Sequence, residues 1–254
     1  MLTGFEELSY TSPSGSAHLL EAAAGFFNAF FGPSEHVVAA HVLATNGVTA
    51  SIDMVAWSLC EPGDAILYPI PSFYMLDLSL TLRNGVVAIP VAVEHTVGVD
   101  PFAATEQAAR DVQYCFSRAI RSLSDSGVRC RAVFLCNPTN PQGRCYPPAT
   151  LQSLARLCTQ NGMHLIADEI YALSNFSGGK EPFSSVLGIP KASTSNFQNI
   201  HCLYGMSKDF SFGGLRMGFV VTRNDRLVRA LKKLSYVNLE YPRLWHPLDL
   251  YFYL

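Results

Sequence analysis

Charged residues are scarce in this sequence, and neither sign dominates. Of the 254 residues, 18 are Lys or Arg and 20 are Asp or Glu, which gives a formal net charge of −2 at pH 7. Proteins that bind nucleic acids or acidic membrane surfaces usually carry a clustered excess of basic residues. We therefore expect no nucleic-acid partner and no polybasic contact with a membrane.

Long apolar runs are also lacking. No stretch reaches the roughly 20 residues that a membrane-spanning helix needs, and the N-terminus has no basic segment followed by an apolar one. We therefore expect no membrane association and a cytoplasmic location.

Metal-ligand spacing is a third absence. The seven cysteines are scattered without a CxxC pair, and the seven histidines show no ligand spacing. Cys136 and Cys202 lie within apolar, strand-like runs. These patterns favour reduced thiols in the core of a cytosolic protein and predict no metal site.

What the sequence does have is apolar material in regular blocks. Hydrophobic residues make up 49% of the chain, enough to bury a large core. Helices are expected over residues 17–31, 49–59, 75–82, 103–123, 147–160 and 225–234. Strands are expected over residues 37–44, 65–68, 86–93, 132–136, 164–167, 200–204 and 218–222. This alternation predicts an α/β fold with a largely parallel sheet.

Polar residues at the expected strand ends are the candidate site residues, because ligands of such sheets bind beyond the carboxyl ends of the strands. Four groups occur there: Asn46-Gly47, Asn137 to Gly143, Asp168 to Tyr171, and Ser207-Lys208. Taken singly, each has a structural explanation as a turn, a helix cap, a paired buried acid or a solvated lysine. Whether these four groups are structural or together form a ligand-binding site depends on their combination.

The combination resembles the class I/II aminotransferases, fold-type I enzymes that use pyridoxal 5′-phosphate (PLP). The resemblance rests on Asn-Pro-Thr-Asn-Pro-Gln-Gly at 137–143, Ala-Asp-Glu-Ile-Tyr at 167–171, and Ser-Lys at 207–208 with Arg216 eight residues later. The blocks at 8–10 (with 14–16), 61–64 and 68–71 are most similar to the 1-aminocyclopropane-1-carboxylate synthase branch and its fungal relatives. The implied fold is the three-layer large domain of PLP-dependent transferases, with a mostly parallel mixed sheet between helices.

The resemblance implies the catalytic roles. Lys208 would form a Schiff base with PLP and later carry the substrate α-proton. Asp168 would pair with the pyridine nitrogen and keep it protonated. Tyr171 and Asn140 would hydrogen-bond the ring oxygen.

The resemblance also implies how the phosphate and the ring are held. Arg216 would pair with the phosphate, and Phe73 would stack on the ring, unless it is simply a core aromatic. Tyr10 would reach the phosphate of a neighbouring subunit, because the family builds its sites across a homodimer interface. Backbone amides for the phosphate would come from Gly47, Val48 and Thr49.

One position departs from the family pattern. Gly205 stands three residues before the lysine, where the family usually has a serine or threonine that bonds the phosphate. Losing that hydroxyl contact costs about 0.5–1.5 kcal/mol. Ser207 would compensate only in part, so we expect weak cofactor retention and a gain from Gly205→Ser.

The length of the chain also departs from the family pattern. We expect residues 1–36 to lead into the core, residues 37–234 to form the PLP-binding large domain, and residues 235–254 to form an atypical tail where a small domain would follow. In the family, that small domain supplies the arginine that binds the substrate carboxylate. We therefore expect a truncated chain.

Several functions remain compatible with these residues. The resemblance implies an aminotransferase, or a lyase like 1-aminocyclopropane-1-carboxylate synthase, that acts on a small amino acid. A carbon–sulfur lyase of the same branch and a truncated, non-catalytic relative are alternatives. A Rossmann-like nucleotide-binding protein is opposed by the lack of a GxGxxG turn after the first strand.

Overall fold

The computed structural model describes residues 12–93, 98, 100–176 and 181–236. Tyr10 and residues 237–254 lie outside the described residues. The helices are α1 (Ala17–Phe30), α2 (Val48–Leu59), α3 (Leu76–Thr81), α4 (Glu106–Asp125), α5 (Pro148–Gln160) and α6 (Asp225–Ser235). The strands are β1 (Val42–Thr45), β2 (Ala65–Ile70), β3 (Val87–Ala92), β4 (Cys130–Cys136), β5 (His164–Asp168), β6 (Ile200–Gly205) and β7 (Gly218–Thr222).

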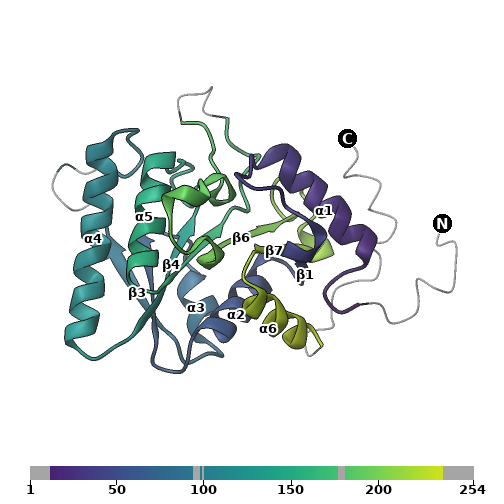
Figure 1. Ribbon diagram of the computed structural model, residues 1–254, viewed down its shortest axis with the longest axis horizontal. Coiled ribbons are helices and arrows are strands. Elements are labelled where there is room, and N and C mark those ends of the chain that lie inside the picture. Colours follow the sequence, from purple (N-terminus) through teal and green to yellow (C-terminus); the bar gives the residue numbers. More distant parts are fainter. Residues whose placement is uncertain (1–11, 94–97, 99, 177–180, 237–254) are drawn as a thin grey trace, which may run out of the picture.

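The strands form one mixed sheet in the order β1-β7-β6-β5-β4-β2-β3 (Figure 1). β3, β2, β4, β5 and β6 pair in parallel, and β7 runs antiparallel to both of its neighbours, β6 and β1. The predicted α/β fold with a mostly parallel mixed sheet is confirmed.

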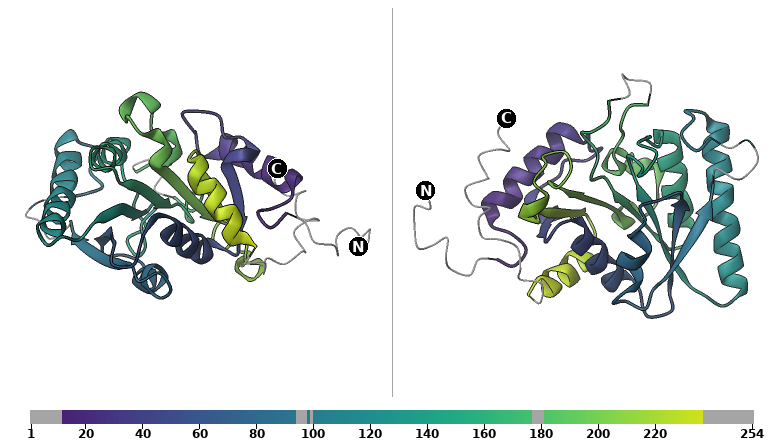
Figure 2. Two further views of the ribbon diagram at one scale, coloured as in Figure 1. Left: turned by 60° about the horizontal axis from the view of Figure 1, so that its bottom comes forward. Right: turned by 180° about the vertical axis from the view of Figure 1, so that it is seen from behind.

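Helices cover both faces of the sheet, as the two views of Figure 2 show. Alternate strand residues point to opposite faces, so Leu165 and Ala167 of β5 join the core beneath α1, α4 and α5, whereas Ile166 joins the core beneath α2, α3 and α6. Each fully buried aliphatic side chain contributes about 1.5–3 kcal/mol. The result is a three-layer arrangement.

The antiparallel strand explains why one lysine and one arginine meet. Gly205 at the end of β6 lies opposite Gly218 at the start of β7, so the loop between them begins and ends at the same edge of the sheet. Gly218 also lies opposite Thr45 at the end of β1. The residues that follow β1 and β6 and those that precede β7 therefore lie together.

The expected strand over 37–44 is half wrong. Only Val42–Thr45 is strand, and Ala39–His41 forms a 3-10 turn. The side chain of Asn28 on α1 accepts from Val37 N (2.9 Å) and donates to Val37 O (2.8 Å). Because Asn28 takes both backbone groups, Val37 has none left for a strand partner.

Other boundaries moved by a few residues. α4 begins at Glu106 rather than near 103, because the Thr105 hydroxyl caps it by accepting from Ala108 N at 3.1 Å. The 3-10 turns Val186–Gly188, Lys191–Ser193, Phe197–Asn199 and Gly213–Leu215 were not expected.

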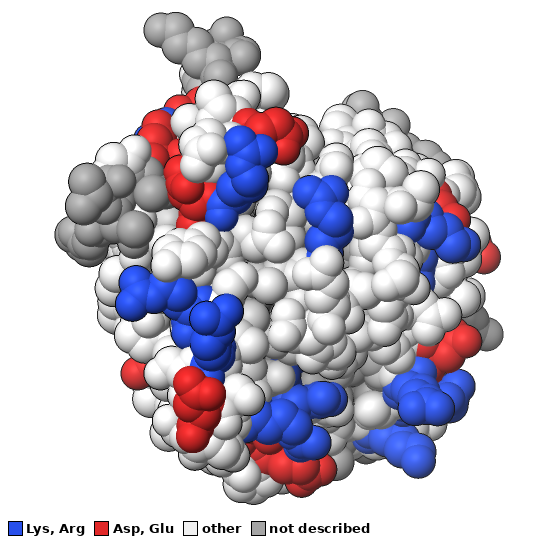
Figure 3. All heavy atoms as spheres, turned by 60° about the vertical axis from the view of Figure 1, so that its left-hand side comes forward, with Lys and Arg blue, Asp and Glu red and all other residues white. Residues whose placement is uncertain are grey.

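Charges on the described surface are of mixed sign. On the face in Figure 3, basic and acidic side chains lie near one another around a broad uncharged area. None of the helices in the described part of the chain combines the length and apolarity needed to cross a bilayer. The absence of a nucleic-acid partner stays a prediction.

Candidate active site

A cavity of about 520 Å³ lies where β4, β5 and β6 end. Its lining includes most of the residues that the sequence predicts for the site: Val48, Thr49, Phe73, Asn140, Asp168, Tyr171, Ser207, Lys208 and Arg216. Gly47 lies directly behind Arg216. Residues far apart in the sequence thus converge on one cavity.

Asp168, the last residue of β5, lines this cavity. Its side chain is almost fully buried, and Oδ1 accepts from Ile170 N at 3.1 Å. Burial raises the pKa of Asp168 to about 7, although the Ile170 bond and the Lys208 charge both lower it. A buried acid of this kind is suited to a cationic partner inside the cavity.

Lys208 and Tyr171 line the same cavity as Asp168. The exposed Lys208 Nζ is 5.9 Å from the centre of the Tyr171 ring. The Tyr171 hydroxyl accepts from Asn140 Nδ2 at 3.2 Å. Burial raises the pKa of Tyr171, and the Asn140 bond opposes that rise. A primary amine, a phenol and an amide therefore face the same space as Asp168.

The two asparagines of the 137–143 turn have different roles. Asn137 is fully buried and bonds only backbone: its N–H donates to Asp168 O (2.9 Å), its Nδ2 to Ser184 O (2.9 Å), and its Oδ1 accepts from Tyr146 N (3.0 Å). Asn137 therefore positions the turn, and Asn140 faces the cavity.

The start of α2 and Arg216 form a cup in the lining of this cavity. The helix begins at Val48, so the N–H groups of its first turn lack helical acceptors and attract an anion. Arg216 lies beside them, and its guanidinium donates to Gly213 O (3.0 Å) and Asn46 O (3.4 Å). Its φ of +52° is uncommon for a residue other than glycine, and such strain collects at functional sites.

Gly47 differs from the expectation in one respect. Its N–H already donates to Thr45 O at 2.8 Å and is not a spare donor for a phosphate. Gly47 instead supplies space, since a Cβ there would lie 2.7 Å from Arg216 Nη2. The donors of the cup are therefore Val48, Thr49 and Arg216.

Three glycines let this cup rest directly on the sheet. A Cβ on Gly218 would lie 2.5 Å from the carbonyl carbon of Gly47. A Cβ on Gly205 would lie 3.0 Å from both Met217 O and Val48 Cγ2. The place of the hydroxyl that the family pattern leads us to expect at 205 is thus crowded, and Gly205→Ser cannot be a simple gain of one contact.

Several lining residues were missed by the sequence reading. One is Tyr74, which is 86% exposed and lies beside the predicted Phe73 with the two rings 5.2 Å apart. The other missed members are Ile52, Cys136 and Ile170. Cys136 directly precedes the Asn137 turn at a strand end, which is the signal that could have found it. Burial raises the pKa of its thiol, so it remains protonated.

Glu169 is a second buried acid beside Asp168, and it points away from the cavity lining. It accepts from Ser185 Oγ (2.5 Å), Val186 N (2.7 Å) and Cys202 Sγ (3.3 Å). Burial raises its pKa to about 7 as well. Glu169 therefore fixes the 184–186 segment against the sheet.

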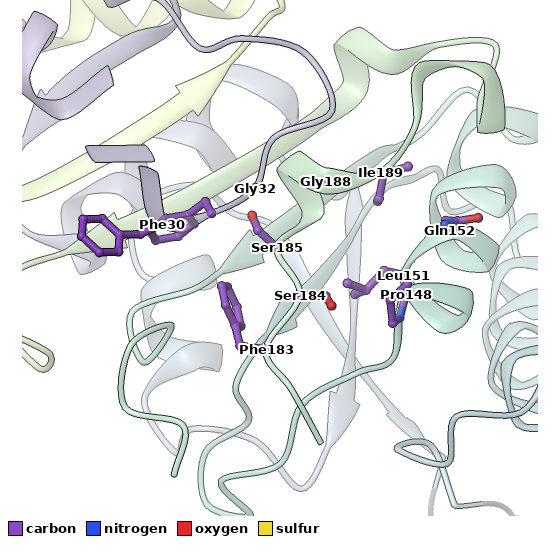
Figure 4. A pocket seen from close by; sticks show the side chains of 11 residues that line it. Phe30, Gly32, Pro148, Leu151, Gln152, Phe183, Ser184, Ser185, Gly188 and Ile189 are labelled. Atoms are coloured by element: carbon purple, nitrogen blue, oxygen red, sulfur yellow. The ribbon is translucent and has the colours of Figure 1, made fainter. Parts of the chain in front are cut away.

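A second cavity of about 350 Å³ lies between the end of α1, the start of α5 and the 183–189 segment (Figure 4). Phe30 and Phe183 flank one side, and Pro148 and Leu151 the other. Its lining contains no titratable side chain. Within the described residues, no group of three or more His, Cys, Asp or Glu side chains could hold a metal ion. The first cavity is thus the candidate active site.

Comparison with known proteins identifies the kind of site. A sequence model described as "Aminotransferase class I and II" matches residues 3–238. The chain belongs to this family. Class I and II aminotransferases depend on PLP, so PLP is the cofactor to compare with the cavity.

Relatives of known name agree with the family assignment. The chain is 33% identical to the Aspergillus oryzae protein "Probable aminotransferase aclI" over 90% of this chain and 53% of that one. It is 30% identical to 1-aminocyclopropane-1-carboxylate synthase 6 of Oryza sativa over 89% of this chain and 40% of that one. The chain thus spans about half the length of the curated relatives it matches.

Solved structures of the family confirm the fold. The Escherichia coli protein YbdL, whose structure is reported to identify a methionine aminotransferase function, superposes with a TM-score of 0.76 at 20% identity. The superposition covers 96% of this chain and 58% of that one. The predicted fold-type I large domain is confirmed.

The cavity fits PLP on its own features. The cup beside Gly47 has backbone N–H groups and one guanidinium, which suit a phosphate. Buried Asp168 suits a pyridinium nitrogen, the Tyr171–Asn140 pair suits a ring hydroxyl, and Lys208 suits an aldehyde. PLP carries all four groups.

Proposed function

We propose that this chain binds PLP in the candidate active site and uses Lys208 to act on an amino acid as an aminotransferase. The observation that carries the proposal is the convergence of Lys208, Asp168, Tyr171 and Asn140 on one cavity with an anion cup. Bound PLP supplies an electron sink that makes the α-proton of an amino acid acidic.

Each residue of the chain would then have one task. The Lys208 amine would hold the cofactor and would take the α-proton of the substrate at Nζ. Asp168 would keep the pyridine nitrogen protonated by forming an ion pair with it. Because Asp168 is buried, water is excluded from that ion pair. Tyr171 and Asn140 orient the ring through its oxygen, Phe73 covers one face, and Ser207 supports the cup. Arg216 anchors the phosphate.

A lyase of the 1-aminocyclopropane-1-carboxylate synthase type is the second candidate. The 30% identity to the rice synthase favours it. Both outcomes begin with removal of the α-proton, so the residues named here serve either. Carbon–sulfur lyase activity and cofactor binding without catalysis are the remaining alternatives, and substrate turnover distinguishes them.

We further propose that the protein acts as a homodimer through the surface beside the site. Tyr74, Met75, Leu78 and Leu82, on α3 and the residues that flank it, are 86%, 37%, 47% and 73% exposed. Leu78 and Leu82 also line a hollow that shares Arg216 with the active site. Such an apolar patch is typical of an interface, and Tyr10 of a second subunit would reach the cup across it. We propose a cytoplasmic location, since all seven cysteines are free.

Absorbance spectroscopy tests the proposed function. Wild-type protein mixed with PLP should develop a visible absorption band, and borohydride should bleach it and leave the cofactor on Lys208 in a peptide map. Lys208→Ala should show neither the band nor the adduct, because no other amine lines the cavity in the described part of the chain.

The control is Lys191→Ala, an exposed lysine paired with Glu35 outside the cavity. It should retain the band. A wild-type protein without a band at saturating PLP would refute the holoenzyme. A band without turnover of methionine-derived substrates, glutamate or cysteine conjugates would favour cofactor binding without catalysis.

A further inference from the structure

Asp209 follows Lys208 directly and accepts three hydrogen bonds. Its Oδ2 accepts from Leu173 N at 3.0 Å and from the Tyr204 hydroxyl at 2.9 Å. Its Oδ1 accepts from the Ser174 hydroxyl. The carboxylate thus connects the lysine loop to a segment more than 30 residues away in the sequence.

The segment that Asp209 holds is the end of the turn that carries Tyr171. Ala172 N donates to Glu169 O, and Ser174 N donates to Tyr171 O, both at 2.9 Å. The start of the same turn is fixed by Glu169, whose N–H donates to Leu203 O at 2.8 Å. Tyr171 is therefore held at the start of its turn by β6 and at the end by Asp209.

The third donor, Tyr204, gives the carboxylate a rigid anchor. Tyr204 is fully buried in β6, and its ring packs against Phe26, Phe27 and Phe31 of α1 and the residue after it at 5.1–5.9 Å. Burial and the neighbouring Asp209 both raise the pKa of Tyr204, so the phenol stays protonated and donates. Asp209 cannot move without breaking this bond.

We propose that Asp209 is a positioning residue, whose carboxylate ties the Lys208 loop to the Tyr171 turn and sets the amine of Lys208 against the Tyr171 hydroxyl. The inference rests on the proposed function, because the two groups must meet the same cofactor. Asp209 does not itself line the cavity. It acts through its neighbour in the chain and through the turn that it holds.

The backbone pairing between the two loops of the site ends with their strands. Asp168 opposite Leu203 is the last pair between β5 and β6. The loop of Lys208 is closed by its own bonds, Ser211 N to Lys208 O (3.1 Å) and Phe212 N to Met206 O (3.0 Å). The Asp209 carboxylate therefore adds a side-chain link between the two loops beyond the last strand pair.

Three variants separate the bonds. Asp209→Asn keeps the shape of the side chain and removes one acceptor oxygen. Tyr204→Phe removes the phenol donor, and the surrounding aromatic cluster can hold a Phe ring in its place. Ser174→Ala removes the hydroxyl donor. Ser174→Thr keeps the hydroxyl and should rescue. Ser117→Ala on α4, whose hydroxyl bonds Gln113 O at 2.8 Å, is the matched control for losing a hydroxyl far from the site.

Hydrogen exchange of the cofactor-free protein is the first measurement. We expect exchange in residues 169–175 and 206–212 to quicken together by about tenfold in Asp209→Asn, as for loss of a bond to a charged acceptor. Residues 148–160 of α5 should not change. Faster exchange in one segment alone, or in neither, would contradict the proposed Asp209 bridge, the link that its carboxylate makes between the Lys208 loop and the Tyr171 turn.

The second measurement is the visible band of the PLP-loaded protein as a function of pH. Its midpoint should shift by about 0.5 pH unit or more in Tyr204→Phe and Ser174→Ala, since the groups around the cofactor oxygen move. An unchanged midpoint, with thermal stability lowered as in Ser117→Ala, would reduce Asp209 to a structural role and overturn the proposal. If wild-type protein binds no PLP, the proposed function fails by itself, and the paired exchange result still decides for or against the bridge.

Discussion

Asp168 and Glu169 are neighbouring acids that the fold buries together. Burial raises the pKa of both to about 7, so the ionised form of each carboxylate is destabilised in the cofactor-free protein. Glu169 has three donors as compensation, whereas Asp168 has one backbone donor and the charge of Lys208. Asp168, which has fewer hydrogen-bond donors to offset its burial, is the acid that faces the cavity. Functional sites often keep such destabilising groups because activity needs them.

The Asp168→Asn variant should therefore stabilise the cofactor-free protein. Between pH 4 and 7 the folded state binds more protons at Asp168 than the unfolded state, so wild-type stability falls as pH rises through this window. At pH 8 the variant should gain roughly 2–4 kcal/mol in free energy of unfolding, and the gain should vanish near pH 4. Urea denaturation at both pH values measures it.

Asp125→Asn, at the exposed end of α4, is the control and should show no change of this kind between pH 5 and 8. Equal stability of Asp168→Asn and wild type at pH 8 would mean that the Asp168 carboxylate is not destabilised by burial. With PLP added, Asp168→Asn should lose the visible band, or the band should no longer depend on pH as it does in wild type. The reason is that the pyridine nitrogen would have no anionic partner.

At the scale of elements, the site depends on how closely α2 approaches β7. The two meet through Gly47 and Gly218 without any side chain between them, and Gly205 continues the contact on β6. The cup is thereby held by the sheet rather than by a loop. Any added methyl group must push α2 away from β7.

Gly218→Ala tests this contact. The new Cβ would lie 2.5 Å from Gly47 C and 2.8 Å from Thr45 Oγ1, and overpacking of this kind costs about 1–3 kcal/mol. We expect that loss in the free energy of unfolding, together with weaker PLP binding in a fluorescence titration.

Gly25→Ala is the matched control, because a Cβ on this α1 residue would meet nothing within 4 Å. It should stabilise the protein by about 0.5–1 kcal/mol, as alanine favours a helix interior, and leave PLP binding unchanged. A Gly218→Ala protein as stable as wild type would contradict the close approach.

The secondary elements were largely predictable because their apolar runs and caps are local. Ser16 caps α1, with its hydroxyl accepting from Leu19 N at 3.1 Å. The exception at Val37 arises from Asn28, a residue on another element, and no local pattern contains that contact. The division of the chain at 36 and 234 stays a prediction.

At the scale of the whole molecule, the cavity was predictable because strand-end residues of a parallel sheet gather at one edge. Lys208, Asp168 and Asn140 were identified in this way. The bonds of Asp209 and Glu169 were not, because they depend on which loops the finished fold brings together. The hydrogen bond from Gly47 N to Thr45 O was missed for the same reason.

The opposite end of the sheet predicts how the whole fold responds to acid. His164 Nδ1 bonds His201 Nε2 (2.9 Å), whose Nδ1 bonds Thr222 Oγ1 (2.8 Å), all buried. Burial, together with the charge of Arg131, lowers the pKa of His164 to about 4. The unfolded state therefore binds more protons between pH 6.5 and 4, and stability should fall as pH drops through that window.

His164→Gln should lose less stability on acidification than wild type, by about 3 kcal/mol between pH 7 and 4. Chemical denaturation across this range measures the difference. Parallel pH profiles for His164→Gln and wild type would show that the buried pair does not set the acid response.

The composition of the cup also bears on redesign. Apart from the Arg216 guanidinium, its donors are backbone N–H groups, so an engineer has few side chains to exchange there, and its suitability for an anion follows mainly from the path of the chain. Altered cofactor preference would have to come from the walls that face the ring, at Phe73, Asn140 and Tyr171. The walls of this cavity can therefore be altered while the cup is kept.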